Sequence, residues 1–291
     1  MWKRWNPIQV SRSHSRIYKQ AKRCPLLAKF SQTNAMSIPD VQIYPHATGA
    51  AAETVKQHQS PQELVFWSGW FCPFVQRAWI ALEEKGIPYQ YKEVNPYKKE
   101  KHFLDINPKG LVPAVEYNGK ALYESLVLLE FLEEAYPSHS PNLLPPDPYD
   151  RAVARIWLDH ITKNYLSAYH RLMQFQEKER QDEAREALYE AQRKLVKQVK
   201  GPYFFGDEFS IVDVAVVPWV QRDWVLSENR AYDRSAVGEA WVKYAKALTE
   251  RPSVQKTQSL RENYLPIYGR YLTNEAQSEA AKAIREGRAI P

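Results

Sequence analysis

The sequence is poor in cysteine, with only Cys24 and Cys72 among its 291 residues. Two cysteines are too few for a disulfide framework or a cysteine-rich zinc site, and a reducing compartment fits this usage best. The chain also lacks any run of about 20 consecutive apolar residues, which a membrane-spanning helix needs. We therefore expect neither an integral membrane protein nor a metal cofactor.

Acidic residues are absent from the first 39 positions, which carry eight Lys or Arg side chains. Residues 40–291 hold 32 basic and 34 acidic side chains, so the formal charge of +6 comes from the N-terminal segment. No basic stripe interleaved with aromatic residues occurs in the rest of the chain. The charge pattern therefore argues against nucleic acid as a partner.

Residues 1–60 are expected to be a leader or extension. Residues 1–35 are rich in Arg, Lys and Ser, and basic residues from Arg12 to Arg23 recur at helical spacing, as in mitochondrial transit peptides. The alternatives are a disordered tail, or a product that begins at Met36. We expect a cytoplasmic location, or a mitochondrial one if residues 1–35 are a working transit peptide.

Residues 61–142 show the pattern of a small α/β domain. An apolar strand at 64–67 precedes a helix at 73–85, which has Pro73 at its first position and Gly86 after its last. A strand at 89–94 and a polar helix around 98–105 follow. The pattern predicts a β-α-β unit with a further helix.

The hairpin signal Asn118-Gly119 then joins strands at 110–117 and 120–123. Glu124-Ser125 begins an amphipathic helix that runs to about residue 136. The order βαβαββα is that of a thioredoxin-like domain.

Residues 149–291 follow a Pro-rich linker and show no strand alternation. They are predicted to form an all-α domain. Helices are expected at 149–176, 182–199, 210–226, 237–249 and 274–286. Ser210 and Asp213 predict a capping box, and Pro218 a kink in the helix that follows.

Cys72 precedes the helix at Pro73, where unsatisfied backbone N–H groups and the helix dipole favour a thiolate over a thiol. This position predicts an activated nucleophile, although a lone cysteine beside aromatic residues is also common in inert cores. Val75 stands where thioredoxin-type enzymes carry a second cysteine, which excludes an internal dithiol cycle. A mixed disulfide at Cys72 then needs a thiol from outside, and glutathione is the abundant candidate.

Further positions offer what a bound tripeptide needs. A cis bond at Val112-Pro113 would leave the Val112 backbone free to pair with a peptide-like ligand. Glu124 and Ser125 are suited to the α-amino and α-carboxylate groups of a γ-glutamyl unit, and Lys99 to the other carboxylate. Each also has an ordinary interpretation, as a strand start, a helix cap or one charge in a solvated run.

The sequence closely resembles a glutathione transferase of the omega class, in the form found in fungi, over roughly residues 40 to 270. The matching motifs are Phe71-Cys72-Pro73-Phe74, Lys85-Gly86-Ile87, Asn107-Pro108-Lys109-Gly110-Leu111-Val112-Pro113, Tyr123-Glu124-Ser125 and Glu134-Ala135-Tyr136-Pro137. The resemblance implies a thioredoxin-like domain followed by an all-α domain, and a homodimer. It implies Cys72 as the catalytic residue. The glutathione-binding residues that it implies are Lys99, Val112, Glu124, Ser125, Phe74 and Pro113.

In the helical half, Pro218-Trp219 matches the hydrophobic-substrate wall of that class. The residues 204–206 and 210–213 match its folding motif. Trp219, Trp157 and Tyr169 are therefore expected to line a hydrophobic substrate pocket. Further candidates, each more often a packing residue at such spacing, are Tyr149, Arg155, Tyr165 and Trp224.

Together, Cys72 and the resemblance imply a glutathione-dependent thiol transferase or reductase that works through a mixed disulfide. Deglutathionylation and dehydroascorbate-type reduction are the activities that the class suggests, because relatives with Ser in place of this Cys favour conjugation or ligand binding. The alternative is a binding protein that sequesters aromatic or polyphenolic compounds. A membrane-inserting role, as in similar chloride-channel-like proteins, is disfavoured because Arg77, Glu83 and Glu84 interrupt the first helix.

Overall fold

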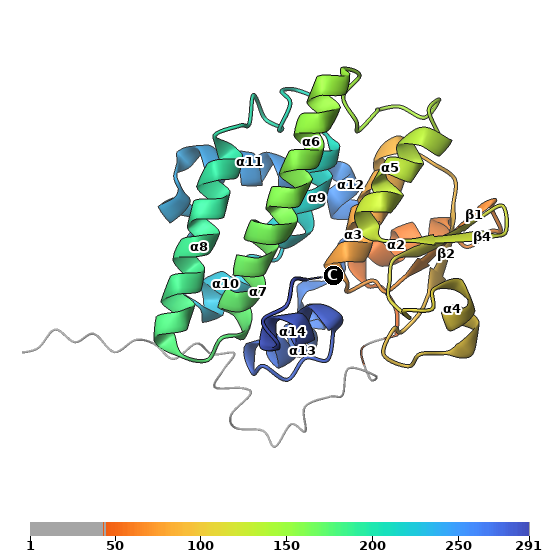
Figure 1. Ribbon diagram of the computed structural model, residues 1–291. Coiled ribbons are helices and arrows are strands. Elements are labelled where there is room, and N and C mark those ends of the chain that lie inside the picture. The colour runs from red at the N-terminus through yellow and green to blue at the C-terminus, as the bar shows by residue number, and fades with distance from the viewer. Residues whose placement is uncertain (1–42, 44, 291) are drawn as a thin grey trace, which may run out of the picture. The chain divides into compact units, whose positions relative to one another are not determined.

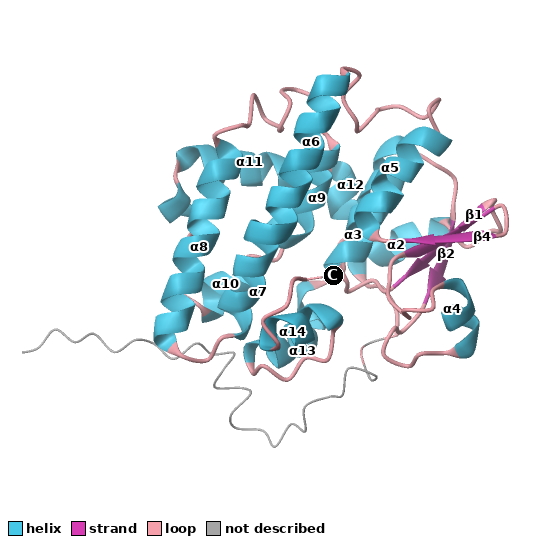
Figure 2. Ribbon diagram, in the orientation of Figure 1, coloured by secondary structure: helices cyan, strands magenta, loops and turns pink. Residues whose placement is uncertain are grey.

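The computed structural model describes residues 43 and 45–290. The expected leader at 1–35, together with Cys24 and Met36, lies outside these residues. Figure 2 shows that all the drawn strands belong to the N-terminal half and that the rest of the described chain is helical. This arrangement confirms the predicted α/β domain followed by an all-α domain.

The sheet begins with a parallel β-α-β unit. Strand β1 (Leu64–Ser68) leads into helix α3 (Pro73–Lys85), and β2 (Gln90–Glu93) pairs in parallel with β1. Helix α3 has Pro73 in its first turn and ends at Gly86, whose φ of 61° is left-handed. Proline and glycine thus mark the two ends of this helix, as predicted from the sequence.

A hairpin completes the sheet. Strands β3 (Ala114–Tyr117) and β4 (Lys120–Tyr123) are antiparallel, and the strand order is β2-β1-β3-β4. Asn118 and Gly119 both have positive φ, at 51° and 72°, which the tight hairpin turn requires. The predicted strand at 110–117 starts only at Ala114, directly after the cis bond between Val112 and Pro113.

Helices cover both faces of this sheet. Helices α3 and α5 (Ser125–Ala135) lie side by side on one face, where Phe66 and Val115 join the main core. Helix α4 (Lys101–Ile106) covers the other face, where its Phe103 packs with Ala114 and Trp67. Figure 1 shows α4 and α3 on opposite sides of the strands. The α3 face is continuous with the core of the helical half.

The helical half contains a long interrupted helix and several shorter ones. Its α-helices are α6 (Pro148–His160), α7 (Ser167–Gln174), α8 (Lys178–Val196), α9 (Ile211–Val220), α10 (Trp224–Asn229), α11 (Glu239–Thr249), α12 (Pro252–Lys256), α13 (Arg261–Leu272) and α14 (Glu279–Arg285). A π-helical segment, η2 (Ile161–Leu166), joins α6 to α7, and a 3-10 turn, η3 (Arg234–Val237), precedes α11. The predicted helix at 149–176 is therefore one run with a wider turn in its middle.

The start of α9 confirms the predicted capping box. Asp213 accepts hydrogen bonds from the backbone N–H of Ser210 at 2.8 Å and of Phe204 at 3.0 Å. It also accepts one from the Tyr244 hydroxyl at 2.7 Å. Helix α9 is buried along its whole length and ends at Val220, soon after Pro218. This carboxylate therefore joins α9, α11 and the loop before α9 in the middle of the helical half.

Other elements were not predicted. Helix α2 (Gly49–Gln57) falls within the expected extension at 1–60, yet the Thr54 hydroxyl donates to the Lys256 carbonyl of α12 at 2.8 Å. Helix α2 thus packs on α12, although it lies within the segment expected to be an extension. Helices α12 and α13 were missed as well. Among the described residues, no helix is long and apolar enough to cross a bilayer.

Candidate active site around Cys72

Cys72 lies at the start of α3 and is half-buried. Its backbone N–H donates to the Gly69 carbonyl at 2.9 Å, and its own carbonyl accepts from Gln76 at 3.1 Å. The loop before the helix therefore turns tightly and is fixed at both sides of the cysteine. The thiol Sγ lies 3.9 Å from the carbonyl oxygen of Val112.

Burial and polar neighbours move the pKa of this thiol in opposite directions. Burial raises the pKa of Cys72 above its ordinary value. The backbone N–H groups of Val75 and Phe74 and the positive charges of Arg222 and Arg77 lower it, but burial outweighs them. The helix N-terminus thus acts in the predicted direction, and the burial of the thiol, which the sequence does not show, acts against it.

The cis bond expected at Val112-Pro113 is present. Nearby, the Lys99 ammonium donates to the carbonyls of Lys109 at 3.0 Å and Gly110 at 3.1 Å. Gly110 has a φ of 62°, and a Cβ at this position would stand only 2.8 Å from Lys99 Nζ. Glycine is therefore required both by the backbone and by the approach of Lys99. Partial burial lowers the pKa of Lys99.

Glu124 and Ser125 stand at the start of α5. Glu124 has a φ of 78°, a left-handed conformation that is rare for a residue with a side chain, and its carboxylate accepts from Lys109 Nζ at 2.6 Å. Ser125 is buried, and its hydroxyl accepts from Arg77 Nη1 at 3.2 Å. The same guanidinium donates from Nε to the Ala215 carbonyl of α9 at 2.8 Å. Arg77 therefore ties this corner of the site to the helical half.

A cavity of about 420 Å³ collects most of the predicted residues. Its wall includes Cys72, Phe74, Lys99, Val112, Pro113, Glu124, Ser125, Tyr169 and Trp219. Phe74 and Trp219 meet edge to face, with ring centroids 5.0 Å apart. The cavity wall thus combines polar and aromatic side chains, which suits a peptide-like ligand beside an apolar one.

Comparisons with known proteins agree with this geometry. The family model for the glutathione S-transferase N-terminal domain matches residues 71–135, and that for the C-terminal domain matches residues 177–235. A probable glutathione S-transferase, parC, from Nicotiana tabacum is 33% identical over 199 residues, covering 67% of this chain and 89% of that protein. The chain belongs to the glutathione transferase family.

Two further comparisons concern the omega class. Glutathione S-transferase omega-1 from Sus scrofa is 30% identical over 216 residues, which is 72% of this chain and 86% of that protein. The crystal structure of glutathione transferase Omega 3C from Trametes versicolor is 63% identical, has a TM-score of 0.76 and covers 80% of this chain and 100% of its own. The chain is therefore an omega-class glutathione transferase, as its motifs indicated.

The aromatic part of the cavity wall in this transferase differs from expectation at one predicted residue. Trp157 is not in the cavity wall, because its ring packs on Phe204 at 5.8 Å and on His160 at 4.8 Å between centroids. It is a packing residue of α6. The further candidates are also outside this wall: Tyr149 is exposed, Arg155 pairs with Glu130, Tyr165 stacks on Tyr169, and Trp224 packs on Tyr268.

The C-terminal helices supply a wall that was not predicted. Ile267, Tyr268 and Tyr271 of α13 line the cavity, and so do Glu279 and Lys282 of α14. The spacing of the tyrosines along α13 is that of one helix face, which was the available signal. Pro266 lies inside this helix, and a proline within a segment argues against a helix there.

His170 of α7 also lines the cavity and was missed. Burial lowers the pKa of its imidazole to about 4, so the ring is neutral at neutral pH. Its Nδ1 lies 2.8 Å from the Leu166 carbonyl, and the proton is therefore assigned to Nδ1. His170 presents a neutral ring to the cavity.

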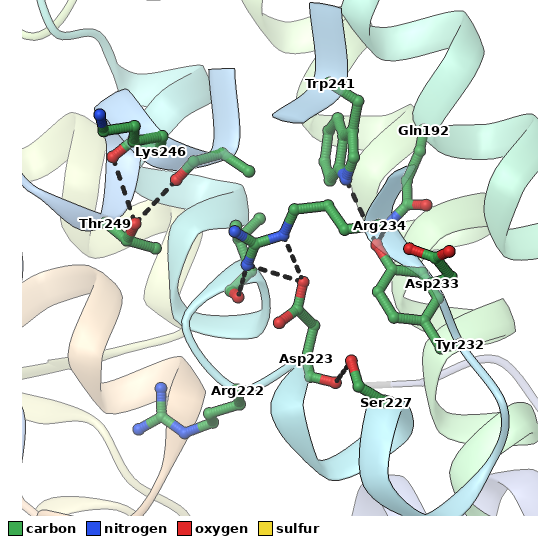
Figure 3. A network of polar contacts seen from close by, with 12 residues as sticks. Gln192, Arg222, Asp223, Ser227, Tyr232, Asp233, Arg234, Trp241, Lys246 and Thr249 are labelled. Atoms are coloured by element: carbon green, nitrogen blue, oxygen red, sulfur yellow. Dashed lines mark hydrogen bonds and ion pairs between the residues drawn. The ribbon is translucent and has the colours of Figure 1, made fainter. Parts of the chain in front are cut away.

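A network of polar contacts holds the turn between α9 and α10 (Figure 3). The Arg234 side chain pairs with Asp223, with Nε at 2.9 Å from the carboxylate, and burial raises the pKa of Asp223 to about 6. The adjacent Arg222 donates to Gln76 of α3 and to the Pro218 carbonyl. Its own carbonyl accepts from the Tyr169 hydroxyl at 2.9 Å. The turn thus positions Tyr169, which lines the cavity, and Arg222, whose charge acts on Cys72.

No group of His, Cys, Asp and Glu side chains suited to a metal ion occurs in the described part of the chain. The family uses glutathione, and one similar structure, rice GST1, was solved in complex with glutathione. That structure is 30% identical with a TM-score of 0.65 and covers 72% of this chain and 98% of its own.

Proposed function

We propose that this transferase moves glutathionyl groups through a mixed disulfide on Cys72. The observation that carries the proposal is the Cys72 thiol, which lines the cavity with no second cysteine among the described residues. Val75, one helical turn further on, is fully buried and apolar, and Cys72 is the free cysteine of the described residues. No second cysteine of the described residues can resolve a disulfide formed here, so the proposed cycle uses a thiol that enters from outside.

The cycle has two thiol–disulfide exchanges. The Cys72 thiolate attacks the glutathione sulfur of a mixed disulfide, which forms Cys72–S–SG and releases the substrate thiolate. A second glutathione thiolate then attacks that sulfur, releasing oxidised glutathione and restoring the Cys72 thiolate. No net oxidant is consumed beyond the substrate disulfide. Reduction of dehydroascorbate-type substrates and deglutathionylation of aromatic ketone conjugates are the related activities that we propose for the same thiol.

The polar residues of the cavity wall support the proposed glutathione site. Val112 would pair with the cysteinyl backbone, Glu124 and Ser125 with the γ-glutamyl end, and Lys99 with the other carboxylate. Phe74 and Pro113 also line the cavity. Because Lys109 already pairs with Glu124, the ligand ammonium would replace the Lys109 ammonium at that carboxylate.

The direct test is Cys72→Ser in an assay that follows release of glutathione from a glutathionylated peptide. We expect kcat/KM to fall by at least about a hundredfold, because a serine hydroxyl cannot form the mixed disulfide. Cys24→Ser is the matched control and should keep wild-type rates. Wild-type turnover by Cys72→Ser would refute the mechanism.

A second candidate function is the binding of aromatic or polyphenolic compounds. The observation that favours it is the aromatic part of the cavity wall, formed by Tyr169, Trp219, Tyr268 and Tyr271. Titration with a fluorescent aromatic ligand tests it, with Trp219→Ala as the variant. Submicromolar binding together with negligible glutathione turnover would favour this role over thiol transfer.

We also propose that the transferase is a homodimer. Val127 of α5 and Ile156 of α6 are 54% and 65% exposed, and they would be covered by a second copy. Light scattering of the purified protein tests the assembly, and a monomer mass at micromolar concentration would exclude it.

The proposed location is the cytoplasm, with mitochondria as the alternative if residues 1–35 act as a transit peptide. Fusion of residues 1–40 to a fluorescent reporter distinguishes the two. Mitochondrial signal would overturn the cytoplasmic proposal.

A further inference from the structure

Charged side chains from the α/β half and from α14 line the same cavity. Lys99 borders it from the loop before α4, and Glu279 and Lys282 border it from α14. Glu279 and Lys282 pair with each other at 2.9 Å, and each side chain is 39% exposed. An anion and two cations from distant parts of the sequence therefore line the same cavity.

The position of α14 is well defined by its packing. Its Ala281 and Ala283 are fully buried against α7 and its surroundings, and the Ala281 carbonyl accepts from Gln174 at 3.1 Å. The Ser278 hydroxyl caps the helix by accepting from the Ala281 N–H at 3.0 Å. The backbone of Lys282 is thus held in place by the packing of α14, and only its side chain needs to move to contact a ligand.

The charges of Lys99, Glu279 and Lys282 interact with one another. The negative charge of Glu279 raises the pKa of Lys99, and the positive charge of Lys282 lowers it. The Glu279 carboxylate therefore acts on both lysines. A ligand carboxylate would be attracted to the same two ammonium groups.

We propose that Lys282 is a second cation for the glycyl carboxylate of glutathione, and that Glu279 competes with that carboxylate for Lys99 and Lys282. The inference rests on the proposed glutathione site at Lys99. It adds a binding residue from the C-terminal helix to a site otherwise built by the α/β half. Glu279 then limits the affinity, since the ligand must displace it from Lys282.

The test compares two ligands by calorimetry, S-methylglutathione and S-methyl-γ-glutamylcysteine, which lacks only the glycine. Neither has a free thiol, so neither forms an adduct with Cys72. The full chain is used as wild type and as Lys282→Met, Glu279→Gln and Lys243→Met. Lys243 is the matched control, because it pairs with Glu239 on an exposed face of α11, outside the cavity wall.

We expect Lys282→Met to weaken S-methylglutathione binding about threefold to tenfold, the range of a partly exposed charge contact. Binding of the ligand without glycine should change by less than about twofold. Glu279→Gln should tighten S-methylglutathione binding, and Lys243→Met should change neither ligand.

Equal losses for the two ligands in Lys282→Met, or no loss for either, would overturn the role of Lys282. Weaker S-methylglutathione binding in Glu279→Gln would overturn the competition. If the wild-type chain bound neither ligand, the proposed glutathione site would be refuted, together with the role of Lys282. Loss of thiol transfer in Cys72→Ser is independent of all these results.

Discussion

The thiol of Cys72 lies 3.9 Å from the carbonyl oxygen of Val112, the residue before the cis proline. An S–H group donates to a carbonyl, whereas a thiolate is repelled by it, so this neighbour favours the neutral thiol. The contact agrees with the direction in which burial moves the pKa. The Cys72 thiol is therefore held beside the residue before the cis proline, in surroundings that favour its neutral form.

The first prediction concerns the pH dependence of Cys72 alkylation. Because the thiolate is the reactive form and the pKa of Cys72 is raised, the iodoacetamide rate should climb about tenfold per pH unit from pH 6 to at least pH 9. The rate is measured in the Cys24→Ser variant, so that one thiol reports. A plateau below pH 7 would show that the helix N-terminus outweighs burial.

A second prediction uses two glycines with similar backbones. Gly110→Ala and Gly119→Ala each place a side chain at a positive φ, 62° and 72° respectively, which costs about 1 kcal/mol, and Gly110→Ala should cost more because its Cβ also meets Lys99. Only the first also displaces the Lys99 ammonium, since nothing lies within 4 Å of a Cβ at Gly119. Glutathione binding should weaken in Gly110→Ala alone.

Calorimetric affinities and urea midpoints for both variants separate the two effects. Equal affinities in the two variants would mean that the position of Lys99 has no part in binding.

The third prediction concerns Glu93 of β2, whose carboxylate accepts from Trp70 N–H at 3.0 Å and from the Tyr91 hydroxyl at 2.9 Å. Burial raises its pKa to about 7, above the value of about 4.3 in an unfolded chain. Between these values the folded state holds a proton that the unfolded state has lost. This contribution to stability is complete below about pH 4.3 and is lost as the pH rises to about 7.

The free energy of unfolding of the wild type, relative to Glu93→Gln, should therefore fall by at most about 1.4 kcal/mol per pH unit across this window and stay level above it. Urea unfolding at pH 5, 6, 7 and 8 measures the difference. A wild-type advantage that grows with pH would contradict the raised pKa.

Local signals were sufficient to predict the elements that carry the candidate site in the α/β half. Pro73 and Gly86 bound α3, Asn118-Gly119 forms the hairpin turn, and Cys72 stands at the helix start. Each signal depends on backbone preferences of a few adjacent residues, which the sequence shows directly. The same holds for the capping box at Asp213.

The missed features depend on residues that are distant in sequence. Helix α13 has tyrosines at helical spacing but contains Pro266, and its packing on α7, which supports the helix, involves residues distant in sequence. The pKa of Cys72 depends on burial by both halves of the chain, and so its direction could not be read from the helix N-terminus alone. Trp157 was expected in the cavity wall, but helical spacing does not show which neighbouring element each face of α6 contacts.

The most direct test of the central claim is mass spectrometry of the full chain after exposure to oxidised glutathione. We expect one glutathione on the peptide that contains Cys72, removed by a second, reduced glutathione and absent from Cys72→Ser. Labelling confined to Cys24 would contradict Cys72 as the thiol that carries the glutathionyl group.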